Sequence, residues 1–213
     1  MKGVKFGGLR SDKDFGLVLY SKKISPPVVK TTTIDIPGRD GKLDITEALT
    51  GRVAYEDREI SFVFRVPNPK EEWANIYSDV LNRLHGKRME IVLDDDPDYF
   101  YAGRISIDEF ATSRSLAEIG VKCIVAPKKT YKTPVSRTVA VSGTKTMEVT
   151  NNGLPTVPII IADKEMDVSF GGVAYHISPG KNKIFDILIP EGKSKLIFSG
   201  TGNVTVEYKV QSL

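Results

Sequence analysis

The sequence predicts a mainly β protein: an N-terminal β-sandwich with one α-helix and an extended β-hairpin, followed by a C-terminal β-sandwich. Three observations predict this fold class. The 3.6-residue apolar period of an amphipathic helix occurs in one stretch, residues 73–84. Elsewhere the apolar runs are short and rich in Val, Ile and Thr, as strands are. Gly, Pro and Asn pairs separate these runs, most regularly in the second half of the chain.

The predicted helix has an apolar face and marked ends. At its start, Asn68 can cap the helix, Pro69 suits the first helical position, and Glu71 stands where a capping box needs a carboxylate. Gly86 supplies the left-handed residue that ends a helix. The apolar face recurs at spacings of three and four residues and consists of Trp73, Ile76, Tyr77, Val80, Leu81 and Leu84.

Strands surround the helix in the sequence. Apolar residues alternate strictly over residues 60–66, which predicts a half-buried strand. After the helix, residues 89–93 and 99–107 predict two strands joined by an acidic turn. Residues 38–51, GRDGKLDITEALTG, contain three glycines and both charge signs, and predict a long exposed hairpin or loop. Further strands are expected at residues 4–6, 17–20, 28–36 and 116–125.

The basic, proline-bounded segment at residues 127–134 is the predicted linker, so we place the domains at residues 1–130 and 131–213. Turn signals punctuate the second domain, and we read Gly200-Thr201-Gly202-Asn203 as one of its hairpin turns. Short strands with regular turns and no helix predict a β-sandwich. Its strands are expected at residues 135–141, 145–149, 157–162, 167–170, 173–177, 183–189, 195–198 and 203–210.

Composition and charge exclude several classes of protein. No apolar run approaches the roughly 18 residues that span a bilayer, and the N-terminus lacks the apolar core of a signal peptide. The single cysteine, Cys123, lies in an apolar run and predicts a buried, inert thiol. Residues 1–127 have a net charge of −1 and residues 128–213 of +4, so neither half carries the concentrated basic face of a nucleic-acid binder.

The residues that could carry chemistry have plainer explanations. Asp94, Asp95, Asp96 and Asp98 resemble the opening of a calcium loop, but the sixth position lacks its glycine, and a solvated hairpin turn explains them better. His85, in the last helical turn, suits the negative end of the helix dipole. We find no nucleophile elbow, phosphate loop or metal-ligand spacing. We therefore predict no enzyme activity, no catalytic or metal residues and no cofactor.

One resemblance stands beside this physical interpretation. GRDGKLDITEALTGRVAYEDREISFVF, the helix ending LHGKRMEIVLDDDPDYFYAGRIS, and APKKTYKTP together resemble the distal tail protein family of long, non-contractile-tailed bacteriophages, in the family's order, over about residues 1–134. The second half agrees more loosely, through TNNGLPTVPIII and FSGTGNVTVEYKVQSL.

The resemblance implies a structural role in the virion, at the tail tip, after synthesis in the cytoplasm of the bacterial host. Proteins of this family form a hexameric ring that joins the tail tube protein to the tail-associated protein and, in some cases, to a receptor-binding protein. DNA passes through the ring without specific binding. The N-terminal domain builds the ring, and the C-terminal domain is a galectin-like or carbohydrate-module-like sandwich. By this resemblance the hairpin would make subunit contacts through Arg39, Asp40, Gly41, Lys42, Asp44 and Glu47.

The alternative function is a non-catalytic carbohydrate-binding module that attaches to host cell-wall glycans. Such sites stack sugars on exposed aromatic rings, and we name Tyr175 as the residue to test. The second half contains no tryptophan, and most of its aromatic residues lie within strand patterns where core packing explains them. They are Tyr131, Phe170, Tyr175, Phe185, Phe198 and Tyr208.

Overall fold

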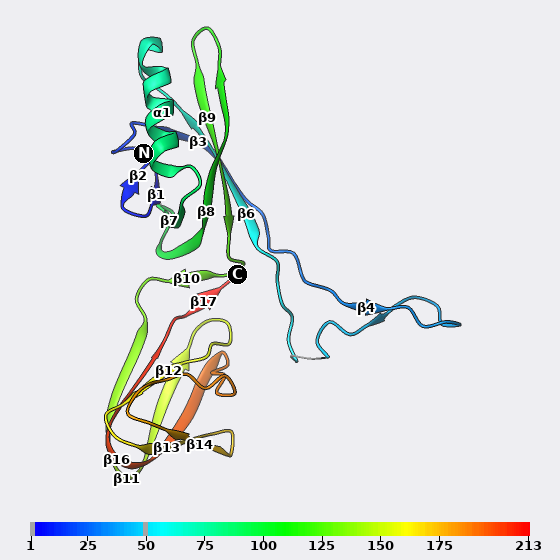
Figure 1. Cartoon of the computed structure of the whole chain (residues 1–213), viewed down its shortest axis with the longest axis vertical. Helices are drawn as coiled ribbons and strands as arrows, with labels where there is room; N and C mark the ends of the chain where they lie inside the picture. The colour runs from blue at the N-terminus through cyan, green and yellow to red at the C-terminus, as the bar shows by residue number, and fades with distance from the viewer. Residues whose placement is uncertain (1–2, 49–50) are drawn as a thin grey trace. The chain divides into compact units, whose positions relative to one another are not determined.

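The computed structural model describes residues 3–48 and 51–213 (Figure 1). The chain divides into two compact units, and the boundary falls between Lys129 and Thr130. Each unit has its own cluster of buried apolar residues. In the part of the chain that the structure describes, no helix has the length and apolar character needed to cross a membrane. The mainly β fold class is confirmed.

The N-terminal unit is built on one antiparallel sheet with the strand order β2-β1-β7-β8-β9-β6-β3. Phe6 lies edge-on to Phe62 and Phe64, with ring centroids 5.9 and 6.3 Å apart. Three strands separate β1 from β6 in the sheet order, so this contact shows that the sheet curls over and packs against itself. The strands are β1 (Val4–Phe6), β2 (Leu9–Arg10), β3 (Val18–Ile24), β6 (Arg58–Arg65), β7 (Arg88–Leu93), β8 (Asp96–Thr112) and β9 (Ala117–Val125).

The helix α1 (Trp73–Leu84) packs on this core with the predicted face. A short 3-10 turn, η1 (Lys70–Glu72), precedes it, and Gly86 follows it with φ +73°. The predicted capping box is wrong, because neither helical segment has a side-chain cap at its start. Instead the Asn68 side-chain amide donates to the Glu72 carboxylate, and the Asn68 backbone carbonyl accepts the indole N–H of Trp73 at 2.8 Å. Trp73 is buried, so its indole bond determines where the chain enters the helix.

The C-terminal unit is organised around two paired strands, β11 (Val135–Asn151) and β16 (Gly192–Tyr208), which are hydrogen-bonded along all 17 residues of each. Along its other side, β16 pairs first with β13 and then with β12. The remaining strands are β12 (Ile159–Ala162), β13 (Met166–Phe170), β14 (Val173–Ile177) and β15 (Gly180–Asn182). Two short strands pair with each other: β10 (Lys129–Tyr131), at the unit boundary, and β17 (Gln211–Ser212), near the end of the chain.

Three predictions for this unit are wrong. Residues 135–141 and 145–149 lie in one strand, and so do residues 195–198 and 203–208. Residues 200–203 therefore make no hairpin turn. Residues 183–189 are not a strand either; they form a turn in which the Ile187 N–H donates to the Ile184 carbonyl at 3.2 Å.

Two glycines lie inside β16 because residues 163–166 pack closely against the strand at these positions. Gly200 and Gly202 have φ of +148° and +152°, values that residues with a side chain rarely adopt. A Cβ on Gly200 would lie 2.6 Å from Met166 Cβ, and one on Gly202 would lie 2.2 Å from Asp163 Oδ1. The two glycines thus make room for the connection between β12 and β13 rather than ending the strand.

Candidate assembly interface

An arm leaves the N-terminal sheet between β3 and β6 (Figure 1). We define it as residues 25–48 and 51–57. The limbs meet at its base, where Val29 and Tyr55 form a β-bridge and the Lys30 N–H donates to the Ala54 carbonyl at 2.9 Å. Farther out, β4 (Thr33–Ile34) pairs with β5 (Leu43–Asp44). The predicted exposed hairpin is therefore present and longer than residues 38–51, of which residues 49–50 lie outside the described part.

The arm has no core of its own. None of its described residues is buried, although apolar residues occur along it. Val28 is 66% exposed, and Val29, Ile34 and Ile36 are also exposed. The strand predicted at residues 28–36 is thus mostly wrong, since β4 comprises only two of these residues. Exposed apolar side chains on an element that packs against nothing are a property of surfaces that bind other proteins.

The predicted interface residues divide into two groups. Hydrogen bonds from the Thr46 side chain and from the Thr46 N–H, the latter at 2.9 Å, lower the pKa of the Asp44 carboxyl. Lys42 lies 3.4 Å from Asp35. Arg39, Asp40, Gly41 and Glu47 form no ion pair in residues 3–48 and 51–213, and Gly41 has φ +72° in the turn at the arm tip. No partner chain is present, so their contact with other subunits stays a prediction.

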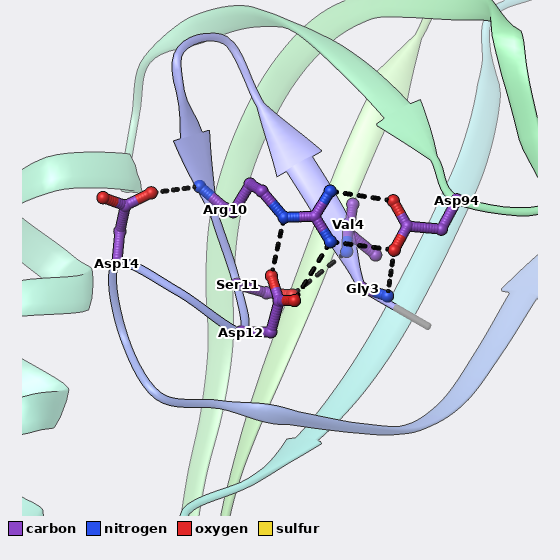
Figure 2. Close-up of polar contacts among 7 residues, drawn as sticks. All are labelled: Gly3, Val4, Arg10, Ser11, Asp12, Asp14 and Asp94. Atoms are coloured by element: carbon purple, nitrogen blue, oxygen red, sulfur yellow. Dashed lines mark hydrogen bonds and ion pairs between the residues drawn. The ribbon is translucent and has the colours of Figure 1, made fainter. Parts of the chain in front are cut away.

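The acidic segment after β7 forms a hairpin turn whose carboxylates are paired with cations. Arg10 Nη2 lies 2.9 Å from Asp94 Oδ2, and Arg10 also binds Asp12, whose Oδ1 lies 2.8 Å from Nε (Figure 2). These bonds hold the pKa of both carboxyls below its usual range. Asp95 pairs with Lys22, and Asp96 Oδ2 lies 2.7 Å from Lys129 Nζ.

The predicted exposed hairpin turn is present, since Leu93 pairs with Asp96 across it and Asp95 and Asp98 are exposed. The ion pairs are an addition that the sequence did not indicate, because three consecutive carboxylates have cationic partners. Asp94 Oδ2 also accepts the Gly3 N–H at 2.7 Å, so it ties the first described residue to the turn between β7 and β8 (Figure 2). Sequence reasoning missed Arg10, which is 84 positions from Asp94. In the described part of the chain, no group of three or more His, Cys, Asp or Glu is placed to hold a metal.

His85 and Cys123 contribute to the structure of the N-terminal unit. The Ile107 N–H donates to His85 Nδ1 at 3.0 Å. His85 directly follows the last residue of α1, so this bond joins the end of the helix to the middle of β8. Its favourable interaction with the helix dipole stays a prediction. Cys123 is fully buried, and burial raises the pKa of its thiol to about 12, so the predicted inert thiol is confirmed.

The aromatic residues considered for sugar binding separate by burial. Phe198 and Tyr208 belong to the core of the C-terminal unit, where the Tyr208 hydroxyl donates to the Thr150 carbonyl at 2.8 Å. Tyr131, Phe170 and Tyr175 pack partly against that core. Phe185 is 73% exposed on the 183–189 turn, with Lys183 Nζ 5.1 Å from its ring centroid.

Comparison with known proteins gives one kind of likeness. No protein-family model matches the sequence, and no curated protein matches it. Among solved structures, the chain is similar to the crystal structure of SPP1 Dit (gp 19.1), described as a paradigm of hub adsorption apparatus in Gram-positive infecting phages. The TM-score is 0.72 at 13% sequence identity, over 100% of both chains. This chain has the Dit fold. The likeness that the sequence motifs indicated is confirmed at the level of the fold.

Proposed function

We propose that this chain is a non-enzymatic structural component of a bacteriophage tail tip. The observation that carries the proposal is the likeness to SPP1 Dit over the whole of both chains, which covers both units in the same order. A fold alone does not define a function. The arm is a second support, because its exposed apolar residues suit binding to another protein. The chain would be part of the virion after synthesis in the host cytoplasm.

The proposed assembly is a closed homo-oligomeric ring of six copies. Residues 1–130 would build the ring, and residues 131–213 would carry other tail parts. A ring closes through heterologous interfaces, in which two different surfaces of the same chain meet. The arm supplies one such surface, with Val28, Ile34 and Ile36 exposed and no internal core to cover them. Removing these side chains from water on a neighbouring copy would stabilise the ring.

The ring would join the tail tube protein to the tail-associated protein, and it could also hold a receptor-binding protein. DNA would pass through the ring without specific binding. The balance of charge supports this, since a net charge of −1 over residues 1–127 does not favour binding to phosphates.

The mass in solution tests the ring. We expect light scattering after size exclusion to give six copies, and negative-stain images to show a central hole. The decisive variant replaces residues 31–53 with Asn-Gly, a pair that suits a two-residue hairpin turn and keeps Lys30 opposite Ala54. We expect this variant to be monomeric with both units folded. A variant that still forms rings would contradict the role of the arm.

Phe185 favours the second candidate function, a carbohydrate-binding module in the C-terminal unit. The Phe185 ring is exposed, and the turn that carries it also contains the buried residue Ile187. Such a ring could stack on a sugar. The test is binding to host cell-wall glycans on an array, lost in Phe185→Ala and kept in Tyr175→Ala. Absence of binding to every cell-wall glycan would leave the tail-tip function alone.

A further inference from the structure

We propose that the arm tip of one copy binds a hollow beside the helix of the next copy, with Arg39 as the residue that enters it. The proposal rests on the proposed ring and names the surface that receives the arm. It depends on the shape and charge of the hollow, on the free cation at the arm tip and on the reach of the arm.

The hollow lies between α1 and the loop that precedes β3. Its volume is about 390 Å³. Ile76 provides apolar surface, and carboxylate and amide groups surround it. The lining residues that matter here are Asp14, Phe15, Asn68, Asn75, Ile76 and Asp79. An apolar surface with acidic and amide groups around it suits a side chain that has an aliphatic stem and a cationic end.

The hollow keeps a negative charge. Arg83 pairs with Asp79 at 3.1 Å and lies over the Phe15 ring at 4.6 Å, which neutralises that carboxylate. Asp14 Oδ2 accepts the backbone N–H of Arg10 at 2.6 Å (Figure 2). Arg83 Nη1 donates to the Asp14 backbone carbonyl at 3.5 Å, but no Lys, Arg or His side chain of the described residues lies within ion-pair distance of the Asp14 carboxylate. The carboxylate of Asp14 is therefore available to a cation from outside.

The Arg10 cluster, in contrast, offers no such place. There Arg10 already bonds both Asp12 and Asp94, and Lys22 pairs with Asp95. A partner's cation would have to break bonds that exist within the subunit. This comparison selects the hollow rather than the acidic turn as the receiving surface.

The arm tip presents the complementary charge. Arg39 lies exposed in the terminal turn, where its N–H donates to the Ile36 carbonyl at 3.1 Å, and no carboxylate of the described residues pairs with it. Lys42 is less suitable because it lies beside Asp35. At about 3.3 Å per extended residue, the stretch from residue 30 to residue 39 spans at most roughly 30 Å, so the tip can lie well away from its own sheet.

The fit follows from the chemistry of arginine. The three methylene groups of Arg39 would lie on Ile76, while the planar guanidinium binds the Asp14 carboxylate in bidentate fashion. The amide oxygens of Asn68 and Asn75 can accept its remaining N–H groups. Each contact joins two different surfaces of the same chain, as a closed ring requires.

A charge exchange between the two surfaces tests the proposal. Asn75 lines the hollow, is exposed, and lies on α1, where lysine has the higher helix propensity, so Asn75→Lys adds a positive charge without harming the helix. We expect Arg39→Glu and Asn75→Lys each to raise the protein concentration needed for half assembly by roughly 100-fold, since like charges at an interface strongly oppose binding. The double variant should restore assembly to within about tenfold of the original chain.

Controls and outcomes separate this proposal from the ring itself. Asn75→Gln and Lys145→Glu, an exposed change in the C-terminal unit, should assemble as the unchanged chain does. Rings that form normally in both single variants would overturn the Arg39 contact and leave the ring standing. So would a double variant that is no better than the single ones. An unchanged chain that stays monomeric at all concentrations would overturn both proposals.

Discussion

The strand β6 and the arm that leads into it are continuous in the chain but have opposite kinds of surface. In β6, Ile60, Phe62 and Phe64 are buried at every second position. In the arm, Val28 and Ile34 are exposed on a hairpin of similar composition. The residue types are alike, so the difference lies in whether another element packs on them. Apolar residues in β6 stabilise the unit, and those in the arm are left for a partner.

Truncation in the core should have the largest effect on stability. We expect Phe62→Ala to lower the free energy of unfolding of the N-terminal unit by about 3–5 kcal/mol, because it leaves a cavity beside Phe6 and Phe64. Trp73 is the only tryptophan of the chain and is buried in this unit, so its fluorescence reports on the unit directly. An unchanged denaturation midpoint in Phe62→Ala would mean that β1 and β6 do not pack as described.

The second prediction concerns close approach in the C-terminal unit. Gly200→Ala should destabilise that unit by roughly 2–3 kcal/mol, because the new Cβ meets Met166 and the backbone keeps a positive φ. Gly143, its partner in the β11–β16 pair, is a matched control. It also has positive φ but has open space around it, so Gly143→Ala should cost about 1 kcal/mol.

Circular dichroism would follow this unit, and Trp73 fluorescence would show that the N-terminal unit is unaffected. Equal losses in Gly200→Ala and Gly143→Ala would show that backbone strain alone matters, and that the contact with Met166 does not.

Local periodicity predicted the parts of the fold in which one surface is buried. The alternation over residues 60–66 and the helical face of Trp73, Val80 and Leu84 both follow from burial on one side, and both are confirmed. The hairpin turn predicted at Gly200 and Gly202 is wrong, although paired glycines usually indicate a turn. The parity of the apolar residues was the better signal, since Leu196, Phe198, Val204, Val206 and Tyr208 all point to the same core.

Long-range polar contacts and the state of the arm could not be predicted from the sequence. Arg10 lies 84 positions from Asp94, and nothing local indicates that the folded sheet brings them together. The composition of residues 28–36 suits a buried strand as well as an exposed one. What decides between them is whether the fold places anything against Val28 and Ile34, which is a tertiary property.

The Arg10 network should give a smaller, pH-dependent effect. The pKa of Asp94 and Asp12 is lowered by Arg10, so their contribution to stability is present above the ordinary Asp value of 3.8 and is lost as the pH falls below it. Arg10→Gln should lower the stability only slightly at pH 7, since the pairs are partly exposed, and should flatten the acid side of the stability curve. Denaturation of both proteins from pH 7 to pH 2 checks this; parallel curves would contradict it.

The smallest effect on stability should come from the arm, and it completes the comparison with β6. Ile34→Ser replaces an exposed side chain that packs on no core, so we expect the free energy of unfolding to change by less than about 0.5 kcal/mol. Ile60→Ser changes a fully buried position in β6 and serves as the comparison variant. We expect it to lower the free energy of unfolding of the N-terminal unit strongly, because it buries a hydroxyl group in the core. If the arm binds a neighbouring copy, Ile34→Ser should also weaken ring assembly in light scattering while Trp73 fluorescence shows normal folding. A large loss of stability in Ile34→Ser would instead mean that the arm packs on its own subunit.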